Sequence, residues 1–266
     1  MIRDITLGQY YPGESLIHKL DPRLKIISTF VFIIALFLVR DFIGFGVCAV
    51  SLAFVIALSR VPLSFILRGL RPIFIIIMMT FVLNIFMTGG EPIFRWGVLA
   101  ITKEGLSRAV FLVIRISLLI IGSSVLTLTT KPLSLTDGIE CILKPLRVFK
   151  VPAHELAMMM GIALRFIPTL LEETDKIMKA QMARGADFES GSILKRAKSL
   201  VPILVPLFMG AFRIASDLAM AMEARCYRGG DMRTRMQEMK IKKLDVLGII
   251  CTVLFLTAVI AEKIAL

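Results

Sequence analysis

The 266-residue chain has few of the residues from which metal sites and disulfide frameworks are built. It contains four cysteines and two histidines, and no two cysteines form a C-x-x-C pair. So small and scattered a set predicts neither a disulfide framework nor a zinc site. His18 and His154 stand alone, without a metal-ligand spacing such as H-E-x-x-H. We therefore expect structural or interfacial roles for both, and no bound metal.

Motifs for nucleotide binding and for acyl transfer are also missing. Neither G-x-x-x-x-G-K-[ST] nor G-x-S-x-G occurs in the sequence. If ATP is involved, it must therefore be bound by partners, and we expect no cofactor on the chain itself and no catalytic residue. The first 25 residues are polar and lack the apolar core of a cleavable signal peptide.

Apolar residues are abundant, at 57% of the chain with a mean hydropathy of +0.82. Soluble domains have about 45–50% apolar residues, so the excess indicates a membrane protein. The chain nevertheless carries 32 Lys and Arg against 20 Asp and Glu, for a net charge of +12. Charged and apolar residues must therefore be segregated along the sequence.

Five apolar stretches are candidates for crossing a bilayer, which takes about 17–25 residues per helix. They are residues 26–39, 42–58, 73–88, 109–129 and 244–261. Arg40 and Asp41 separate the first two, and we place them in a turn because an ion pair in mid-bilayer is costly. The predicted fold is an all-α integral membrane protein with about five transmembrane helices.

The distribution of Lys and Arg predicts the orientation in the membrane. These residues are concentrated in 1–25, 59–71 and 131–243, and are sparse in the alternate loops. Because cytoplasmic loops carry the excess of basic residues, we expect a cytoplasmic N-terminus and an external C-terminus. The basic run that precedes the last span is expected to contact anionic lipid, and not nucleic acid.

This topology divides the chain into three segments. Residues 1–130 hold an N-terminal cytoplasmic arm and four transmembrane helices, and residues 244–266 hold the last transmembrane helix. The segment between them, 131–243, is predicted to contain long amphipathic cytoplasmic helices. Its apolar residues recur at helical spacing from Ala153 onward, with a kink or reset at Pro168, and a second helix runs from about residue 193 to 224.

Both long helices end in a triplet in which an arginine lies between two small residues. The triplets are Ala183-Arg184-Gly185 and Ala224-Arg225-Cys226. An arginine here favours the negative end of the helix dipole, which is a purely structural explanation. Small neighbours would in addition let a partner approach closely, and a guanidinium is a planar fork that suits carboxylates. The repetition favours two projections that bind two acidic partners.

The sequence resembles a known family, the transmembrane coupling (T) component of energy-coupling factor (ECF) transporters. The resemblance covers nearly the whole chain and includes the runs Tyr11-Pro12-Gly13-Glu14-Ser15 and Leu20-Asp21-Pro22-Arg23-Leu24-Lys25. The order of spans and long helices and the two triplets also match. The second triplet departs mildly, with Cys226 where the family often has Gly or Ser.

The resemblance implies a non-catalytic subunit in a bacterial plasma membrane. Arg184 and Arg225 would each engage one of two cytoplasmic ABC ATPases, which bind ATP and Mg2+, and a separate membrane substrate-binding (S) subunit would lie against the long helices. A vitamin and a transition-metal ion are both open as substrates. The candidate S-subunit contacts are methionines, for each of which ordinary packing is the simpler explanation: Met158, Met159, Met160, Met209, Met220 and Met222.

Two alternatives stay open at this point. Glu223-Ala224-Arg225 with Gly229 partly matches the cytoplasmic E-A-A-x-x-x-G loop of conventional ABC importer permeases, although Arg225 replaces the second alanine. A membrane enzyme acting on lipid would need clustered acids or a histidine, and the acids present show no catalytic spacing. Within the spans, Arg115 is a candidate functional cation, with pairing or snorkelling as the simpler explanation, and Asn84 is expected to form interhelical hydrogen bonds.

Overall fold

The structure is a computed structural model that describes residues 10–39, 41–89, 92–96, 99–149, 152–186, 188, 198–227, 229 and 241–265. Nearly all its regular structure is helical, which confirms the predicted all-α class. The chain forms two compact units. The larger unit contains the helices up to α7 together with the last helix, and the smaller contains α8 and α10.

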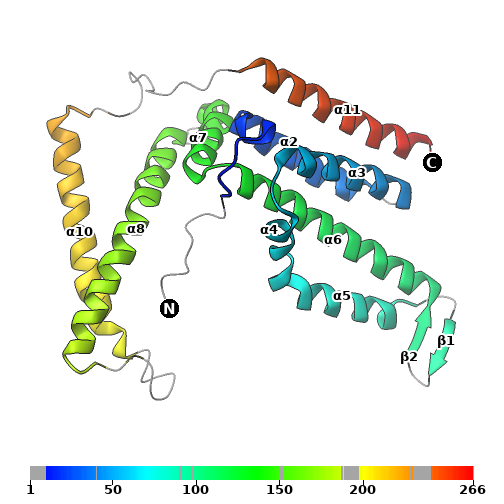
Figure 1. Ribbon diagram of the computed structural model, residues 1–266, viewed down its shortest axis with the longest axis horizontal. Coiled ribbons are helices and arrows are strands. Elements are labelled where there is room, and N and C mark those ends of the chain that lie inside the picture. Colours follow the sequence, from blue (N-terminus) through cyan, green and yellow to red (C-terminus); the bar gives the residue numbers. More distant parts are fainter. Residues whose placement is uncertain are drawn as a thin grey trace. The chain divides into compact units, whose positions relative to one another are not determined.

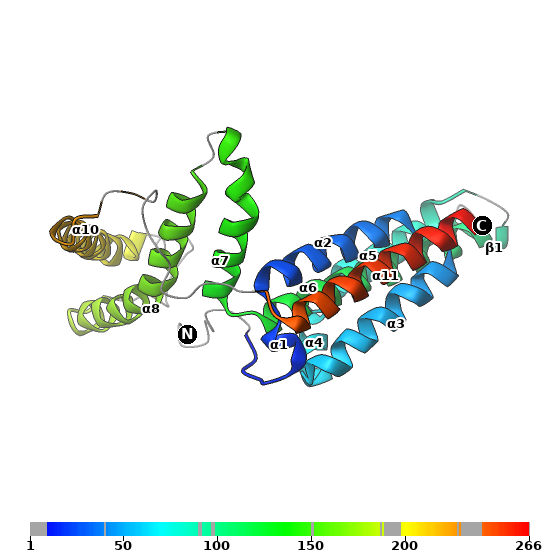
Figure 2. The same cartoon turned by 90° about the horizontal axis from the view of Figure 1, so that it is seen from above.

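In the larger unit, four long helices lie alongside one another in both views (Figures 1 and 2): α2 (Pro22–Leu38), α3 (Phe42–Ser59), α6 (Lys103–Thr129) and α11 (Lys243–Ala265). Their shared core is apolar and includes Ala35, Leu36, Cys48 and Val259, which are at most 1% exposed, together with buried Phe45. The outward faces are apolar too: Val50 of α3 is 71% exposed. An apolar outward face suits lipid as the solvent.

Shorter elements complete this unit. They are α1 (Leu16–Lys19), α4 (Leu63–Arg68), the 3-10 turn η1 (Arg71–Ile73), α5 (Phe74–Met87) and α7 (Pro132–Leu143). Helix α5 packs along α6, and its outer face carries exposed Ile75, Met79 and Met87. Pro72 lies in η1, directly before α5, where its missing N–H costs no hydrogen bond.

A β-hairpin that the sequence analysis did not predict lies between α5 and α6. Strand β1 (Pro92–Trp96) pairs antiparallel with β2 (Leu99–Thr102). Thr102 then begins α6 as its N-cap, with its side-chain oxygen accepting a hydrogen bond from the backbone N–H of Gly105 at 3.1 Å. The hairpin therefore extends the loop before α6 without altering the helical class.

The predicted spans coincide with α2, α3, α5, α6 and α11. Among the described residues, six helical segments are long and apolar enough to cross a membrane, and four of the five expected spans are among them: α3, α4 to α5, α6 and α11. The fifth, α2, has 17 residues, near the lower limit for a span. The other two of the six are α8 and α10. The cytoplasmic placement of α8 and α10 therefore stays a prediction.

The smaller unit is built on two long helices, α8 (Ala153–Ala183) and α10 (Val201–Ala224), preceded by the 3-10 segment η2 (Lys144–Phe149). Helix α8 runs continuously through Pro168. The start expected for the second helix, near residue 193, lies outside the described residues. The side-chain amide of Gln181, near the end of α8, donates a hydrogen bond of 3.4 Å to the carbonyl of Pro202 at the start of α10. The two helices are therefore antiparallel.

Candidate docking site on the coupling helices

The first arginine triplet forms the C-terminal cap of α8. Arg184 is the cap residue, and Gly185 follows it with φ of 87° in the left-handed region. The Gly185 N–H donates to the carbonyl of Met182 at 2.9 Å, and the Ala186 N–H donates to that of Gln181 at 3.0 Å. This pair of bonds defines a Schellman motif, which satisfies the last carbonyl groups of a helix.

The second triplet repeats this geometry at the end of α10. Arg225 is the cap residue, and Cys226 follows it with φ of 55°. The Cys226 N–H donates to the carbonyl of Glu223 at 2.8 Å, and the Tyr227 N–H donates to that of Met222 at 3.1 Å. Both triplets are therefore the same structural motif and present their arginines at equivalent positions.

The geometry supplies a reason for the small third residue that the sequence analysis did not give. Gly185 lies in open space, with no atom of a more distant residue within 4 Å of the point that a Cβ would occupy, so crowding within the chain does not select glycine there. The left-handed backbone of Gly185 selects glycine, because adopting this conformation costs a residue with a side chain about 1–2 kcal/mol. Cys226 occupies the same conformation and bears that cost.

Both guanidinium groups are available to a partner. Arg184 and Arg225 are exposed, and within the described part of the chain neither forms an ion pair or a side-chain hydrogen bond. Because α8 and α10 are antiparallel, Arg184 lies beside the start of α10 and Arg225 lies at its end. The 24 residues of α10 place them roughly 35 Å apart at about 1.5 Å per residue. One small acidic pocket cannot accommodate both.

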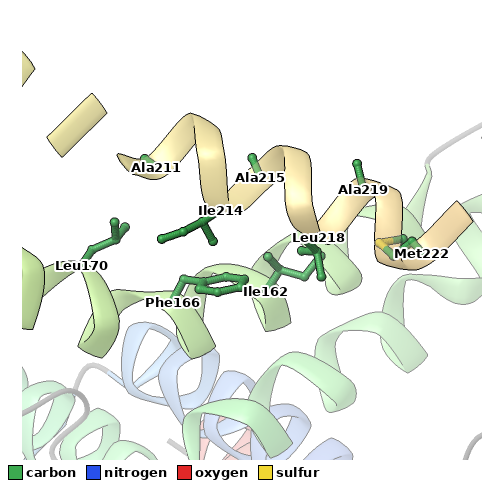
Figure 3. A pocket seen from close by; sticks show the side chains of 9 residues that line it. All are labelled: Ile162, Phe166, Leu170, Ala211, Ile214, Ala215, Leu218, Ala219 and Met222. Carbon is green, nitrogen blue, oxygen red and sulfur yellow. The ribbon is translucent and has the colours of Figure 1, made fainter. Parts of the chain in front are cut away.

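The contact between residues 162–170 of α8 and 211–222 of α10 is apolar. Ile214 and Leu218 of α10 point toward Ile162 and Phe166 of α8 (Figure 3). These side chains, together with a row of alanines on α10, line a hollow of about 220 Å3. The alanines are Ala211, Ala215 and Ala219. Hydrophobic contact therefore holds this part of the pair together.

The six candidate methionines occupy different surroundings. Met159, Met160, Met209 and Met220 are 41–63% exposed, whereas Met158 is half-buried. Met222 lines the hollow between α8 and α10. Successive residues of a helix are about 100° apart, so Met158, Met159 and Met160 cannot share one face. Met209 and Met220, eleven residues apart, do share the outer face of α10.

The N-terminal run that carries the family resemblance is anchored to the end of α6. The backbone N–H of Tyr11 donates to the carbonyl of Leu128 at 2.9 Å. His18 contacts the carbonyl of Tyr11 through Nε2 at 3.0 Å and the hydroxyl of Ser15 through Nδ1 at 2.7 Å. Burial is the main cause that lowers the pKa of His18 and the charge of Lys25 adds to it, while the Tyr11 carbonyl opposes them. His18 therefore has the structural role expected of it.

Three further candidates, Arg115, Asn84 and His154, lie in structural surroundings. Arg115 of α6 donates from Nη2 to the carbonyl of Val39 at 2.8 Å, and its guanidinium lies over the ring of Phe45 with 5.5 Å to the centroid. It therefore pairs inside the bundle, which was the simpler explanation for it. The side-chain amide of Asn84 donates to the carbonyl of Thr80 at 2.8 Å, one turn earlier in α5, so its bond is intrahelical and not interhelical as expected. His154 lies half-buried in the first turn of α8.

The sequence analysis missed a polar cluster at the start of α2. Lys25 and Asp245 are 8% and 2% exposed. Lys25 donates to the backbone carbonyls of His18 and Thr129. Asp245 accepts from the backbone N–H groups of Asp21 and Lys242. Asp245 carries a signal in the sequence, because it is an acid at the very start of an apolar span. Its partner Asp21 lies more than 200 residues away, so spacing alone could not reveal the contact. No group of three or more potential metal ligands occurs in the described residues.

A bundle of helices with apolar outer faces, joined in sequence to a further pair of long helices, is the architecture of a multi-pass membrane protein. The family described as "Cobalt transport protein" (CbiQ) matches residues 13–237. The energy-coupling factor transporter transmembrane protein EcfT of Clostridium kluyveri is 56% identical over 266 residues, which cover 99% of this chain and 98% of that protein. EcfT of Thermosediminibacter oceani is 60% identical over 251 residues, with 94% and 95% covered.

EcfT of Bacillus subtilis is 49% identical over 240 residues, which cover 90% of this chain and 91% of that protein. The chain therefore belongs to the CbiQ family and is similar to its EcfT members over nearly its full length. It is a multi-pass membrane component of a transporter. The resemblance found in the sequence is confirmed, and it favours this class over a conventional permease or a lipid enzyme.

Proposed function

We propose that the chain couples two cytoplasmic ABC ATPases to a separate S subunit and that Arg184 and Arg225 each bind one ATPase. The observation that supports this is the repeated cap geometry, which presents two exposed arginines at opposite ends of one helix pair. Roughly 35 Å is about the diameter of a small domain. That separation suits two motor subunits side by side, each with its own acidic pocket.

In this mechanism the chain itself catalyses no reaction. ATP and Mg2+ are bound by the two ATPases, whose movement displaces α8 and α10. The apolar interface between these helices contains few directional bonds in its described part, so the pair can shift as the ATPases close. The S subunit binds against the outer apolar surface, for which Met209, Met220 and Phe212 of α10 are the candidates.

The S subunit carries the substrate specificity, and the substrate class is a vitamin or a transition-metal ion. The complex lies in a bacterial plasma membrane, with the N-terminus and the α8–α10 pair cytoplasmic and the C-terminus outside. Three arginines near α4 then face anionic lipid headgroups on the cytoplasmic side: Arg60, Arg68 and Arg71.

The test is charge reversal at both caps. Arg184→Glu combined with Arg225→Glu should abolish copurification of the ATPases and transport, while membrane insertion persists. A reversed charge facing a desolvated acidic partner costs on the order of several kcal/mol. Each single variant should lose one of the two ATPase contacts.

Matched controls come from the same helices. Arg165 of α8 and Arg213 of α10 are also exposed but lie away from the caps. Arg165→Glu and Arg213→Glu should retain both ATPases at the wild-type ratio. Recruitment of both ATPases by the double cap variant would contradict the docking role.

A further inference from the structure

The first turn of α2 binds the end of the helix that leads toward the α8–α10 pair. Lys25 lies in this turn, and its Nζ donates to the carbonyl of Thr129, the last residue of α6, at 3.0 Å and to that of His18 at 3.3 Å. Both acceptors belong to helix C-termini, where carbonyl groups lack partners and a cation is favourable. Lys25 therefore fixes the end of α6, shortly before α7 begins.

Asp245 binds the start of the helix that follows the pair. Its Oδ2 accepts from the backbone N–H of Lys242 at 2.6 Å, directly before α11, and its Oδ1 accepts from the backbone N–H of Asp21 at 2.8 Å. Asp21 is itself the N-cap of α2. An anion is favourable at two helix N-termini, so this carboxylate joins the starts of α2 and α11.

Close packing reinforces both attachments. Gly138 places α7 against the same turn of α2: a Cβ at this position would lie 3.2 Å from Cβ of Pro22 and 3.0 Å from Cδ1 of Ile26. Gly248 places α11 against α2 in the same way, because a Cβ there would lie 2.6 Å from Cδ2 of Leu24. A side chain at Gly248 would require the ends of Leu24 and Leu20 to move, and one at Gly138 would require Ile26 and Pro22 to shift slightly.

These contacts bracket the smaller unit along the chain. The chain leaves the larger unit at the end of α7, forms α8 and α10, and returns shortly before α11. Thr129 precedes the departure, and Lys242 follows the return. Both positions are held through backbone groups, Thr129 by Lys25 in the first turn of α2 and Lys242 by Asp245 in the first turn of α11, which also binds the N-cap of α2.

We propose that Lys25 and Asp245 together form a root clamp, which holds the chain at both ends of the coupling segment (residues 131–241). The two connections to the larger unit then stay fixed, and movement of α8 and α10 is transmitted to the S subunit. This inference rests on the proposed coupling function. Lys25 and Asp245 are positioning residues, since neither touches an ATPase or a substrate. Without the clamp, the ATPases move the helix pair, but its connections yield.

The experiment uses the complete complex, with ATPases and S subunit, in lipid nanodiscs. Hydrogen exchange is measured by mass spectrometry with and without AMP-PNP and Mg2+. The variants are Lys25→Met, which keeps the apolar stem, and Asp245→Asn, which is nearly isosteric. Both should assemble and hydrolyse ATP within about twofold of wild type, while the nucleotide-dependent change in exchange of the S subunit falls at least about tenfold.

Two further variants separate clamping from general packing. Ser28→Ala removes another contact between α2 and α11, the 3.0 Å hydroxyl pair of Ser28 and Thr252, without touching either connection. Ser28→Ala should show the wild-type nucleotide-dependent change in hydrogen exchange of the S subunit. Lys25→Arg should restore part of the change that Lys25→Met loses. A wild-type response of the S subunit in both clamp variants would overturn the inference. Absence of ATPases from the wild-type complex would instead overturn the proposed function.

A second measurement applies if a clamp variant fails to assemble. In the wild-type complex, the amides of Asp21 and Lys242 donate to Asp245 and should exchange slowly. Nucleotide should change exchange in α8 and α10 but leave these two amides protected. Loss of their protection on nucleotide binding would show that the connections yield during the cycle, and the inference would fail.

Discussion

Gly185 and Cys226 adopt the same left-handed backbone conformation, with φ of 87° and 55°, at equivalent positions after two different helices. Each donates its N–H to the carbonyl three residues earlier and so closes the cap that presents an arginine. The conformation is cheap for glycine and costly for cysteine. The cap of α10 is therefore the weaker of the two.

This difference predicts opposite effects of two substitutions. Cys226→Gly should stabilise the end of α10 by about 1 kcal/mol, and Gly185→Ala should destabilise the end of α8 by a similar amount. Exchange rates of the cap amides in each variant would measure the effect. Gly210→Ala is the control, because Gly210 lies in open space inside α10, where alanine should stabilise the helix. Equal effects of alanine at positions 185 and 210 would contradict the conformational explanation.

The hydrogen bond from Arg115 to Val39 predicts that replacing the arginine side chain lowers the stability of the protein. Arg115→Met should destabilise the protein by about 1.5–3 kcal/mol, because the carbonyl of Val39 loses a charged donor at the end of α2. The unfolding temperature in detergent would show the change. Arg108→Met, at an exposed position on the same helix, is the control and should be nearly neutral. No loss in Arg115→Met would mean that the bond to Val39 contributes nothing net.

The lowered pKa of His18 predicts that the stability of the N-terminal arm depends on pH. Burial lowers its pKa in the folded arm below the unfolded value of about 6.5, so the unfolded arm binds the proton more tightly. The contribution of His18 to stability is therefore present above about pH 6.5 and is lost as the pH falls below it. Limited proteolysis of the arm at pH 7.5 and 5.5 should show faster cleavage at the lower pH. His18→Gln should remove most of this difference, and an unchanged pH effect would assign it to another group.

The charge distribution predicts the location of the C-terminus. A reporter enzyme fused after Leu266 should be active outside the cytoplasm, because the basic segment before α11 is expected on the cytoplasmic side and α11 crosses the membrane from there. Fusions in the connection after α10 should report the cytoplasm. A cytoplasmic signal from the C-terminal fusion would contradict both the orientation and the count of five spans.

Local features of the fold could be predicted from the sequence because they depend on neighbouring residues. Apolar runs located the spans, and the end of α8 at Ala183 followed from Gly185, which suits a helix C-terminus. The arginine triplets were recognised, but the left-handed backbone of Cys226 was not, because cysteine seldom adopts it. Helical geometry alone shows that Met158, Met159 and Met160 do not share one face, because successive residues of a helix are about 100° apart.

Contacts between distant segments could not be predicted in this way. Asp21 and Asp245 meet across 224 positions, and the bond between them follows from the packing of α2 against α11. The residues of the run from Leu20 to Lys25 were noticed through a resemblance, whereas their role depends on which helix ends reach them. The hairpin before α6 was missed because its strands are short and lie between two strongly apolar spans.

The root clamp holds main-chain atoms of Thr129 and Lys242, so it does not depend on the side chains at those two positions. We therefore expect residues 131–241 to be exchangeable as one cassette between relatives that keep a glycine at position 138, where α7 packs against α2. Grafting this cassette from one relative into another, with junctions at these residues, should transplant the choice of motor proteins while the lipid-embedded scaffold stays that of the recipient.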